Sequence, residues 1–169
     1  MKILETERLI LRQLTTDDAE FILGLLNEPS FIRNIGDRNV RTIDDACAYI
    51  LNGPVTSYAK NGFGLYLVQL KETGESIGMC GLIKRDTLDD VDIGYALLPR
   101  YWSKGYAVEA AQATMAYGKD VIGLKRLVGI VDPTNEGSIR VLEKIGLRYE
   151  KMVRLSEDDI DLKLFGAEL

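Results

Sequence analysis

Two short segments of the chain carry residue types suited to ligand binding. The first reads YWSKGYA over residues 101–107 and leads from a strand-like run into a helix-like run. Unpaired N–H groups at the start of a helix favour a bound phosphate, and Gly105 and Ala107 leave room for it near the backbone. The spacing is neither that of a P-loop nor that of the dinucleotide-binding glycine motif. Taken alone, an ordinary strand-to-helix turn explains the segment equally well.

The second segment reads VDPTNEGS over residues 131–138 and precedes another helix-like run. Asn135 is suited to cap that helix, and Ser138, three residues later, faces the same helix end. A side-chain amide and a hydroxyl would then lie together at the end of a strand. Simple capping of the helix is the plainer interpretation of this segment on its own.

The chain has no histidine, which narrows the chemistry that it can perform. Ser-His-Asp and Cys-His nucleophiles and most zinc or non-haem iron sites are excluded. The two cysteines, Cys47 and Cys80, lack the spacing of metal ligands and are expected to be buried, reduced thiols. We therefore expect no metal, and acid–base chemistry that relies on carboxylates, hydroxyls, amines or water.

Length and charge limit the classes of protein further. The chain has 169 residues, of which 46% are hydrophobic and 28% charged, which predicts one globular domain over residues 1–169. Its net charge of −5 disfavours nucleic acid and favours a cationic binding partner. The opening MKILE lacks an apolar signal core, and no apolar run approaches the ~20 residues that span a bilayer. These features predict a cytoplasmic protein that does not bind membranes.

The elements that must position the two segments follow from hydrophobic periodicity and turn residues. The order is strand, two helices, three strands, helix, strand, helix and two strands, which predicts a mixed α/β sheet domain. Expected strands are 9–14, 64–70, 76–84, 91–98, 127–131, 147–155 and 160–165. Expected helices are 15–27, one from residue 42 that Gly53-Pro54 breaks or ends, 105–120 and 136–145.

Five stretches, taken in order, resemble the GNAT N-acetyltransferase superfamily. They are ETERLILR (5–12), IGMCGL (77–82), DIGY (92–95), YWSKGYAVEA (101–110), and PTNEGS with LEKIG (133–146). Within that superfamily they are similar to the RimJ/RimL-like branch of N-terminal protein acetyltransferases. The resemblance implies a mostly antiparallel central sheet flanked by helices, with two splayed parallel strands. It also implies that acetyl-CoA, as co-substrate, lies between strands 91–98 and 127–131.

The resemblance also implies roles for individual residues. Backbone groups of Leu97 and Leu98 would hold the pantetheine amides, and Asn135 would bind the pantetheine arm. Ser138 would protonate or solvate the leaving thiolate. The pyrophosphate would rest on backbone N–H groups of Ser103, Lys104, Gly105, Tyr106, Ala107 and Val108.

Two positions depart from the family pattern. Trp102 stands where the superfamily motif [QR]-x-x-G-x-[GA] has a polar residue, so one polar contact is expected to be replaced by packing. Asp92 stands where the branch often has glutamate, and its shorter side chain weakens any base role taken from the family. Asp92, or Glu109 acting through water, could serve as base, although an ordinary carboxylate is a weak base. A structural role, with Glu109 bonded near its helix and Asp92 bonded to a neighbouring strand or loop, is the alternative for both.

The expected reaction is direct attack of a primary amine on the thioester in a ternary complex, with a backbone N–H near Leu97 facing the oxyanion. An α-amine, with a pKa near ~8, loses its proton more readily than a lysine amine near ~10.4. A peptide or protein N-terminus is therefore favoured as acceptor. A small amine (polyamine, amino acid or antibiotic) and a non-catalytic acyl-CoA-binding module stay open as alternatives.

The acceptor side should come from the first two helices, their connecting loop and the final hairpin. Phe31, Arg33 and Asn34 lie in that loop region, and the hairpin is expected to contribute near Tyr149. Arg33 is suited to a peptide carbonyl or carboxylate, although a solvated surface charge explains it equally well. A homodimer is compatible with the sequence, which does not specify the oligomeric state.

Overall fold

The computed structural model describes residues 1–169 and is built on one eight-stranded sheet with the order β1-β2-β3-β4-β5-β6-β8-β7. Neighbouring strands are antiparallel except β5 and β6, which are parallel. The strands are β1 (Lys2–Glu5), β2 (Leu9–Gln13), β3 (Leu65–Leu70), β4 (Ser76–Ile83), β5 (Asp92–Leu97), β6 (Arg126–Val131), β7 (Arg148–Val153) and β8 (Leu162–Glu168). The helices are α1 (Ala19–Leu26), α2 (Pro29–Asn34), α3 (Ile43–Ile50), α4 (Thr56–Asn61), α5 (Tyr106–Tyr117) and α6 (Glu136–Lys144).

The two parallel strands in the middle of the sheet separate almost as soon as they meet. Their register contains the single pair Asp92↔Val128, supported by a 3.1 Å hydrogen bond from the Val128 N–H to the Val91 carbonyl. On their outer sides β5 keeps six residue pairs with β4, and β6 keeps six with β8. The expected mixed α/β fold with two splayed parallel strands is therefore confirmed.

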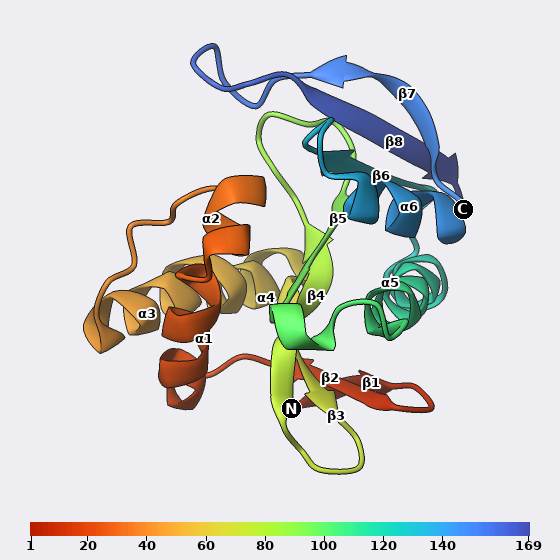
Figure 1. Ribbon diagram of the computed structural model, residues 1–169. Helices are drawn as coiled ribbons and strands as arrows, with labels where there is room; N and C mark the ends of the chain where they lie inside the picture. Colours follow the sequence, from red (N-terminus) through yellow and green to blue (C-terminus); the bar gives the residue numbers. More distant parts are fainter.

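Helices cover both faces of the sheet and pack against the strands on each side of the point where β5 and β6 separate (Figure 1). One apolar cluster joins α1, α2 and α3 to the sheet through residues such as Ile22, Phe31 and Ile50. A second cluster joins α5 and α6 to β5, β6 and β8 through Ala111 and Leu142. None of the helices is both long and apolar enough to span a lipid bilayer.

The chain differs from expectation at three places in its first third. Residues 2–5 form a strand, β1, that was not expected. Pro29 begins the short helix α2, because proline fits the first helical turn, where its missing N–H has no partner to lose. Gly53-Pro54 neither breaks nor ends the helical path. The residues Leu51–Val55 instead form a wide π-helical turn that continues into α4.

Candidate functional site

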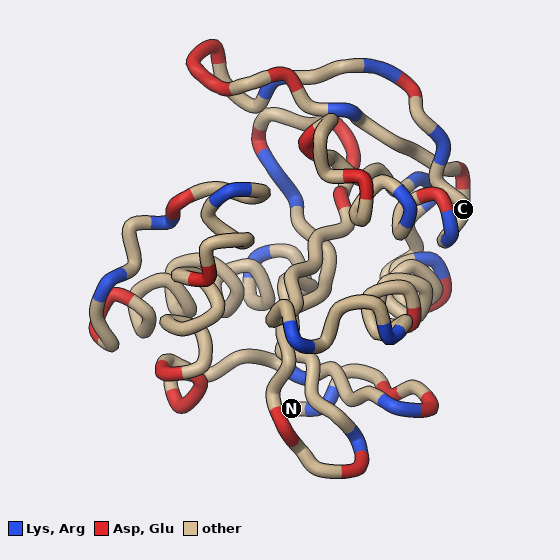
Figure 2. Tube along the Cα trace, viewed as in Figure 1, with Lys and Arg blue, Asp and Glu red and all other residues tan.

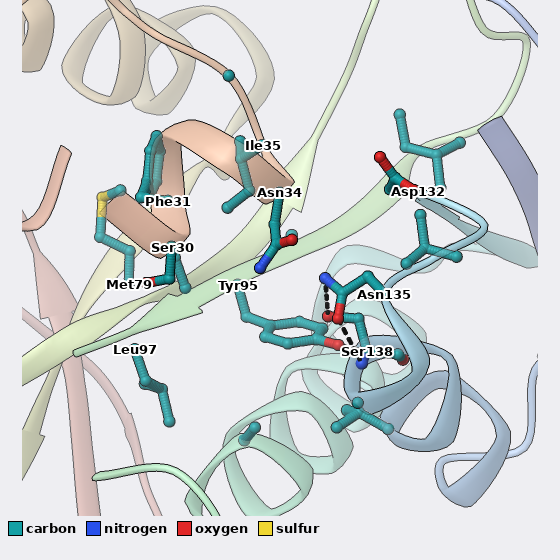
Figure 3. A pocket seen from close by; sticks show the side chains of 18 of the residues that line it. Ser30, Phe31, Asn34, Ile35, Met79, Tyr95, Leu97, Asp132, Asn135 and Ser138 are labelled. Atoms are coloured by element: carbon teal, nitrogen blue, oxygen red, sulfur yellow. Dashed lines mark hydrogen bonds between the residues drawn. The ribbon is translucent and has the colours of Figure 1, made fainter. Parts of the chain in front are cut away.

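A cavity of about 1150 Å³ lies where β5 and β6 separate. At one end it reaches the loop before α5 and the first turn of α6. At the other end it reaches α2, the loop after it and the β7–β8 loop. The side chains in Figure 3 come from both sides of this cleft. The cleft therefore connects the two segments singled out in the sequence with the expected acceptor side.

The loop before α5 presents a row of backbone N–H groups without protein partners. Ser103 and Gly105 have left-handed backbone angles, with φ of 62° and 84°. The first bond of the helix runs from the Glu109 N–H to the Gly105 carbonyl at 3.0 Å, and no N–H group from residue 103 to residue 108 donates to the backbone or a side chain. Such a concave row of amides at a helix N-terminus is suited to an anion.

Residues of this loop do not all face the cleft. Side chains or backbone of Ser103, Gly105, Tyr106, Ala107 and Val108 line it, whereas Lys104 does not. The Lys104 carbonyl points to the other side, where Arg8 Nη1 donates to it at 3.0 Å. Lys104 can therefore contribute only its backbone N–H to a ligand in the cleft.

At the end of β5, Leu97 and Leu98 differ in whether their backbone groups are free to bind a ligand. The Leu98 N–H donates to the Ile77 carbonyl at 2.9 Å, so it is not free for a ligand, and Leu98 does not line the cleft. Because antiparallel neighbours alternate, Leu97 then directs its N–H and carbonyl away from β4 and toward the open side. Leu97 fits the expectation, and for Leu98 the expectation is wrong.

Trp102 makes a polar contact that the sequence pattern did not indicate. Its indole Nε1 donates to the Leu97 carbonyl at 2.9 Å, while the residue remains 46% exposed. The expectation that Trp102 replaces one polar contact of the family motif by packing stays a prediction, and the indole bond to Leu97 adds to it. The carbonyl of Leu97 is already hydrogen-bonded, which leaves the Leu97 N–H as the group available on that residue.

Asn135 and Ser138 meet at the start of α6, as expected (Figure 3). The Asn135 Oδ1 accepts from the Ser138 N–H at 3.3 Å, and its Nδ2 donates to Ser138 Oγ at 3.1 Å. The Ser138 hydroxyl thus receives a hydrogen bond and keeps its own hydrogen for another acceptor. Asn135 likewise keeps one amide hydrogen.

Tyr95 is a site residue that the motif contained but to which no role was assigned. It extends from β5 across the splay, and its Oη donates to the Ser138 carbonyl at 3.3 Å (Figure 3). Burial raises the pKa of Tyr95 to about 12, so the phenol stays protonated at neutral pH. The bond joins the first turn of α6 to the strand on the opposite side of the cleft.

Asp92 lies apart from this group, at the start of β5. Its side chain is 1% exposed and accepts from Arg85 Nε at 3.3 Å with both oxygens. Burial raises the pKa of Asp92 to about 6, although Arg85 acts in the opposite direction. Leu97 lies five positions after Asp92, roughly 16 Å along an extended strand. Proton transfer between the two positions would therefore need intervening water.

Glu109, the other carboxylate considered, faces away from the cleft. It accepts hydrogen bonds from Thr6 and from the backbone and side chain of Arg8. Burial alone would raise the pKa of Glu109, but the hydrogen bonds from Thr6 and Arg8 outweigh burial and hold it below its usual range. The hydrogen-bond partners of Glu109 therefore lie in the turn between β1 and β2, and Glu109 does not line the cavity.

The acceptor end of the cleft is formed partly by α2. Phe31, Arg33 and Asn34 all line it, and Asn34 directs its amide toward Tyr95 and Asn135 (Figure 3). Phe31 is only 6% exposed and packs in the cluster of α1 and α3. Ser30, Arg33 and Asn34 are therefore the polar side chains of α2 that line the cleft.

The β7–β8 loop forms the opposite wall of the acceptor end. Asp158, Asp159 and Ile160 line the cleft, and acidic residues gather at the tip of this loop (Figure 2). Tyr149 instead packs edge-on against Phe165 outside the cavity. The hairpin lines the cleft through its loop, whereas Tyr149, near which a contribution was expected, does not line it. A loop that folds back from the sheet leaves no periodic signal in the sequence.

No group of three or more potential metal ligands occurs in the structure. The two cysteines are free thiols, with Cys80 buried and Cys47 partly buried. The cleft is lined by backbone amides, hydroxyls, side-chain amides, cationic side chains and several carboxylates, among which Asp92 is buried.

A family model, a related sequence and a solved structure each match this chain to acetyltransferases. The sequence model of the acetyltransferase (GNAT) domain matches residues 8–148. The uncharacterized N-acetyltransferase YoaA of Bacillus subtilis is 34% identical over 154 residues, covering 90% of this chain and 86% of YoaA. An acetyltransferase from Agrobacterium tumefaciens has a TM-score of 0.85 at 25% identity, covering 100% of this chain and 95% of that one.

A further solved structure is similar in fold at lower identity. RimL, an alpha-N-protein acetyltransferase in complex with coenzyme A, has a TM-score of 0.86 at 16% identity, covering 100% of this chain and 98% of RimL. At that level of identity the likeness extends to the fold alone.

The free N–H groups at residues 103–108 predict the effect of a substitution in that row. Ala107→Glu should abolish coenzyme A binding, because a bulky anionic side chain would occupy the position of a diphosphate and repel it. Calorimetric titration with coenzyme A measures this loss. Ala116→Glu places the same residue on the exposed side of α5 and should bind as the wild type does. Equal binding by both variants would contradict the placement.

Proposed function

The chain belongs to the GNAT family of acetyl-CoA-dependent N-acetyltransferases, and we propose that its acceptor is the α-amine of a peptide or protein N-terminus. In this proposal the diphosphate of acetyl-CoA binds the N–H groups of residues 103–108. The pantetheine arm follows β5 to the Leu97 N–H, with Asn135 beside it. The acceptor enters from α2 and the β7–β8 loop, so that the two substrates meet between β5 and α6.

The observation that carries the choice of an α-amine is the separation of Asp92 from the meeting point. Tyr95, Ser138, Asn135 and Asn34 surround that point with hydroxyl and amide groups (Figure 3). The carboxylate is buried and reached only through water. An amine that is already partly neutral needs the least help from such a base. An α-amine has a pKa of about 8, whereas a lysine amine has a pKa near 10.4.

The polar side chains of α2 favour a peptide as acceptor over a small amine that has no peptide backbone. Asn34 offers both a donor and an acceptor, which matches the C=O and N–H groups of a peptide backbone. Arg33 adds donors for carbonyl oxygens or for a carboxylate. These side chains lie on the acceptor side of Tyr95, where the residues after an N-terminal amine would extend.

A small polycation is the second candidate acceptor, favoured by the charge of the β7–β8 loop. Asp132, Asp158 and Asp159 line the cleft, although Asp132 is partly engaged by the N–H and hydroxyl of Thr134. Carboxylates at the mouth would attract a cation and increase its local concentration. A polyamine carries the charge for this contact but lacks a peptide backbone for Asn34.

A screen of acceptors distinguishes these candidates. Release of free thiol from acetyl-CoA would be measured with peptides that begin with Ser or Ala, with spermidine and with free amino acids. We expect turnover with peptides, and blocking the peptide α-amine should remove it. Turnover with spermidine alone would favour the polyamine, and turnover with neither would contradict both. Equilibrium binding of coenzyme A, measured in parallel, tests the co-substrate site separately.

In the proposed mechanism Asp92 accepts the proton of the acceptor through water. The deprotonated carboxylate is the active form, so kcat/KM should fall as the pH drops through about 6. The Asp92→Asn variant should lose this acidic limb and keep the limb caused by the amine itself. The pH profile of kcat/KM with a fixed peptide measures both limbs.

Asp90→Asn is the matched control, because Asp90 is a nearby carboxylate with its own arginine partner, Arg126, at 3.1 Å. It should keep the acidic limb. An identical limb in Asp92→Asn would exclude Asp92 as the proton acceptor.

Ser138 stabilises the departing thiolate in this proposal, using the hydroxyl hydrogen that Asn135 leaves free. Ser138→Ala should therefore lower kcat by about tenfold to a hundredfold while changing the KM for acetyl-CoA much less. Steady-state kinetics measures the two constants, and Ser138→Thr, which keeps a hydroxyl, should recover part of kcat. A kcat unchanged by Ser138→Ala would remove the hydroxyl from the mechanism.

A further inference from the structure

The stretch ETERLILR carries part of the family resemblance, yet none of residues 5–12 lines the cleft. It includes the turn between β1 and β2, which lies beside the start of α5 (Figure 1). From this turn Arg8 contacts the loop whose N–H groups face the cleft, and Thr6 contacts Glu109 in the first turn of α5. The turn therefore touches the proposed diphosphate site from behind.

Glu109, in the first turn of α5, is the centre of these contacts. Its Oε2 accepts from the Thr6 hydroxyl and, at 3.0 Å, from the Arg8 backbone N–H. Its Oε1 accepts from Arg8 Nε at 2.7 Å. Thr6 Oγ1 is itself fixed, because it accepts from the Leu9 N–H at 3.0 Å. One carboxylate thus binds α5 to the β1–β2 turn through three hydrogen bonds.

The rest of the Arg8 guanidinium contacts three consecutive residues of the loop. Nη1 donates to the Lys104 carbonyl at 3.0 Å, and the guanidinium carbon lies 4.3 Å from the centre of the Tyr106 ring. A Cβ atom on Gly105 would lie only 3.2 Å from Arg8 Nη2. Arg8 therefore packs closely under the loop segment in which Gly105 is left-handed.

We infer that Thr6, Arg8 and Glu109 are positioning residues for acetyl-CoA, holding the loop so that its N–H groups face the diphosphate. This inference rests on the proposed diphosphate site. The row of N–H groups at 103–108 has no internal partner, so nothing within the loop itself keeps these groups parallel. The contacts with Lys104, Tyr106 and Glu109 fix both ends of the row from the side opposite the ligand.

Arg8 also offsets the negative charge of Glu109 at the N-terminus of α5. Glu109 is a carboxylate in the first turn of α5, where its negative charge would repel a bound diphosphate. Pairing with Arg8 at 2.7 Å neutralises that charge locally. The planar guanidinium can bind Glu109 and the Lys104 carbonyl at once, whereas a lysine ammonium offers one point of contact.

The test compares coenzyme A with pantetheine, which lacks the diphosphate and nucleotide. Trp102, the only tryptophan of the chain, lies next to the loop and is 46% exposed, so its fluorescence reports binding without any acceptor. The variants are Arg8→Lys and Arg8→Gln. Arg100→Lys is the matched control, because Arg100 also lies over a tyrosine ring and pairs with a glutamate, but contacts Tyr101 and Glu75 instead.

We expect both Arg8 variants to raise the Kd for coenzyme A by about tenfold, the usual cost of removing a residue that supports a binding group. The Kd for pantetheine should stay within about twofold of the wild-type value, because no diphosphate is involved. Arg100→Lys should change neither constant. Thermal unfolding of each variant confirms that the fold is intact.

Three results would overturn the inference. An unchanged Kd for coenzyme A in the Arg8 variants would show that the loop needs no support from Arg8. An equal loss of affinity for both ligands would indicate a general effect on the fold. A wild-type chain that does not prefer coenzyme A to pantetheine would overturn the diphosphate site itself, and the positioning role with it.

Discussion

Each backbone N–H and C=O group of a buried strand needs a partner, and β5 loses one of its two neighbours directly after Asp92. From that point the side of β5 that would have paired with β6 is available to something else. Trp102 takes the Leu97 carbonyl, and Tyr95 reaches across to α6. The other backbone groups on this side of β5 face the cleft. The cleft exists because β5 and β6 share one residue pair and then separate.

The requirement that buried backbone groups have partners also applies at the start of α5, where the partners are missing. Six consecutive amides there have no protein partner, which is costly unless water or a ligand binds them. Ser103 and Gly105 in this row have left-handed backbone angles. The Leu97 N–H on the open edge of β5 and the N–H groups of this loop are unpaired backbone groups of one cleft, which the first turn of α6 also lines.

Local signals in the sequence predict much of this framework. The helix expected from residue 42 begins with a capping box of Thr42 and Asp45, and Asn135 caps α6 as expected. Alternating apolar residues give most strands to within one or two positions at their ends. What depends on distant partners could not be read in the same way, as for Leu98, whose N–H donates to Ile77 of β4. The π-helical turn at Pro54 was missed for a local reason: proline usually ends a helix, and here the Thr56 hydroxyl donates to the Leu51 carbonyl at 2.7 Å within the turn. The β7–β8 loop reaches the site only because β8 lies next to β6.

The acceptor walls, α2 and the β7–β8 loop, come from opposite ends of the chain and belong to neither the α5 loop nor the first turn of α6. The part of the cleft that would recognise the donor is thus separate from the part that would choose the recipient. Transplanting α2 or the β7–β8 loop from a related protein would redirect the enzyme toward a new recipient while leaving its grip on the nucleotide intact.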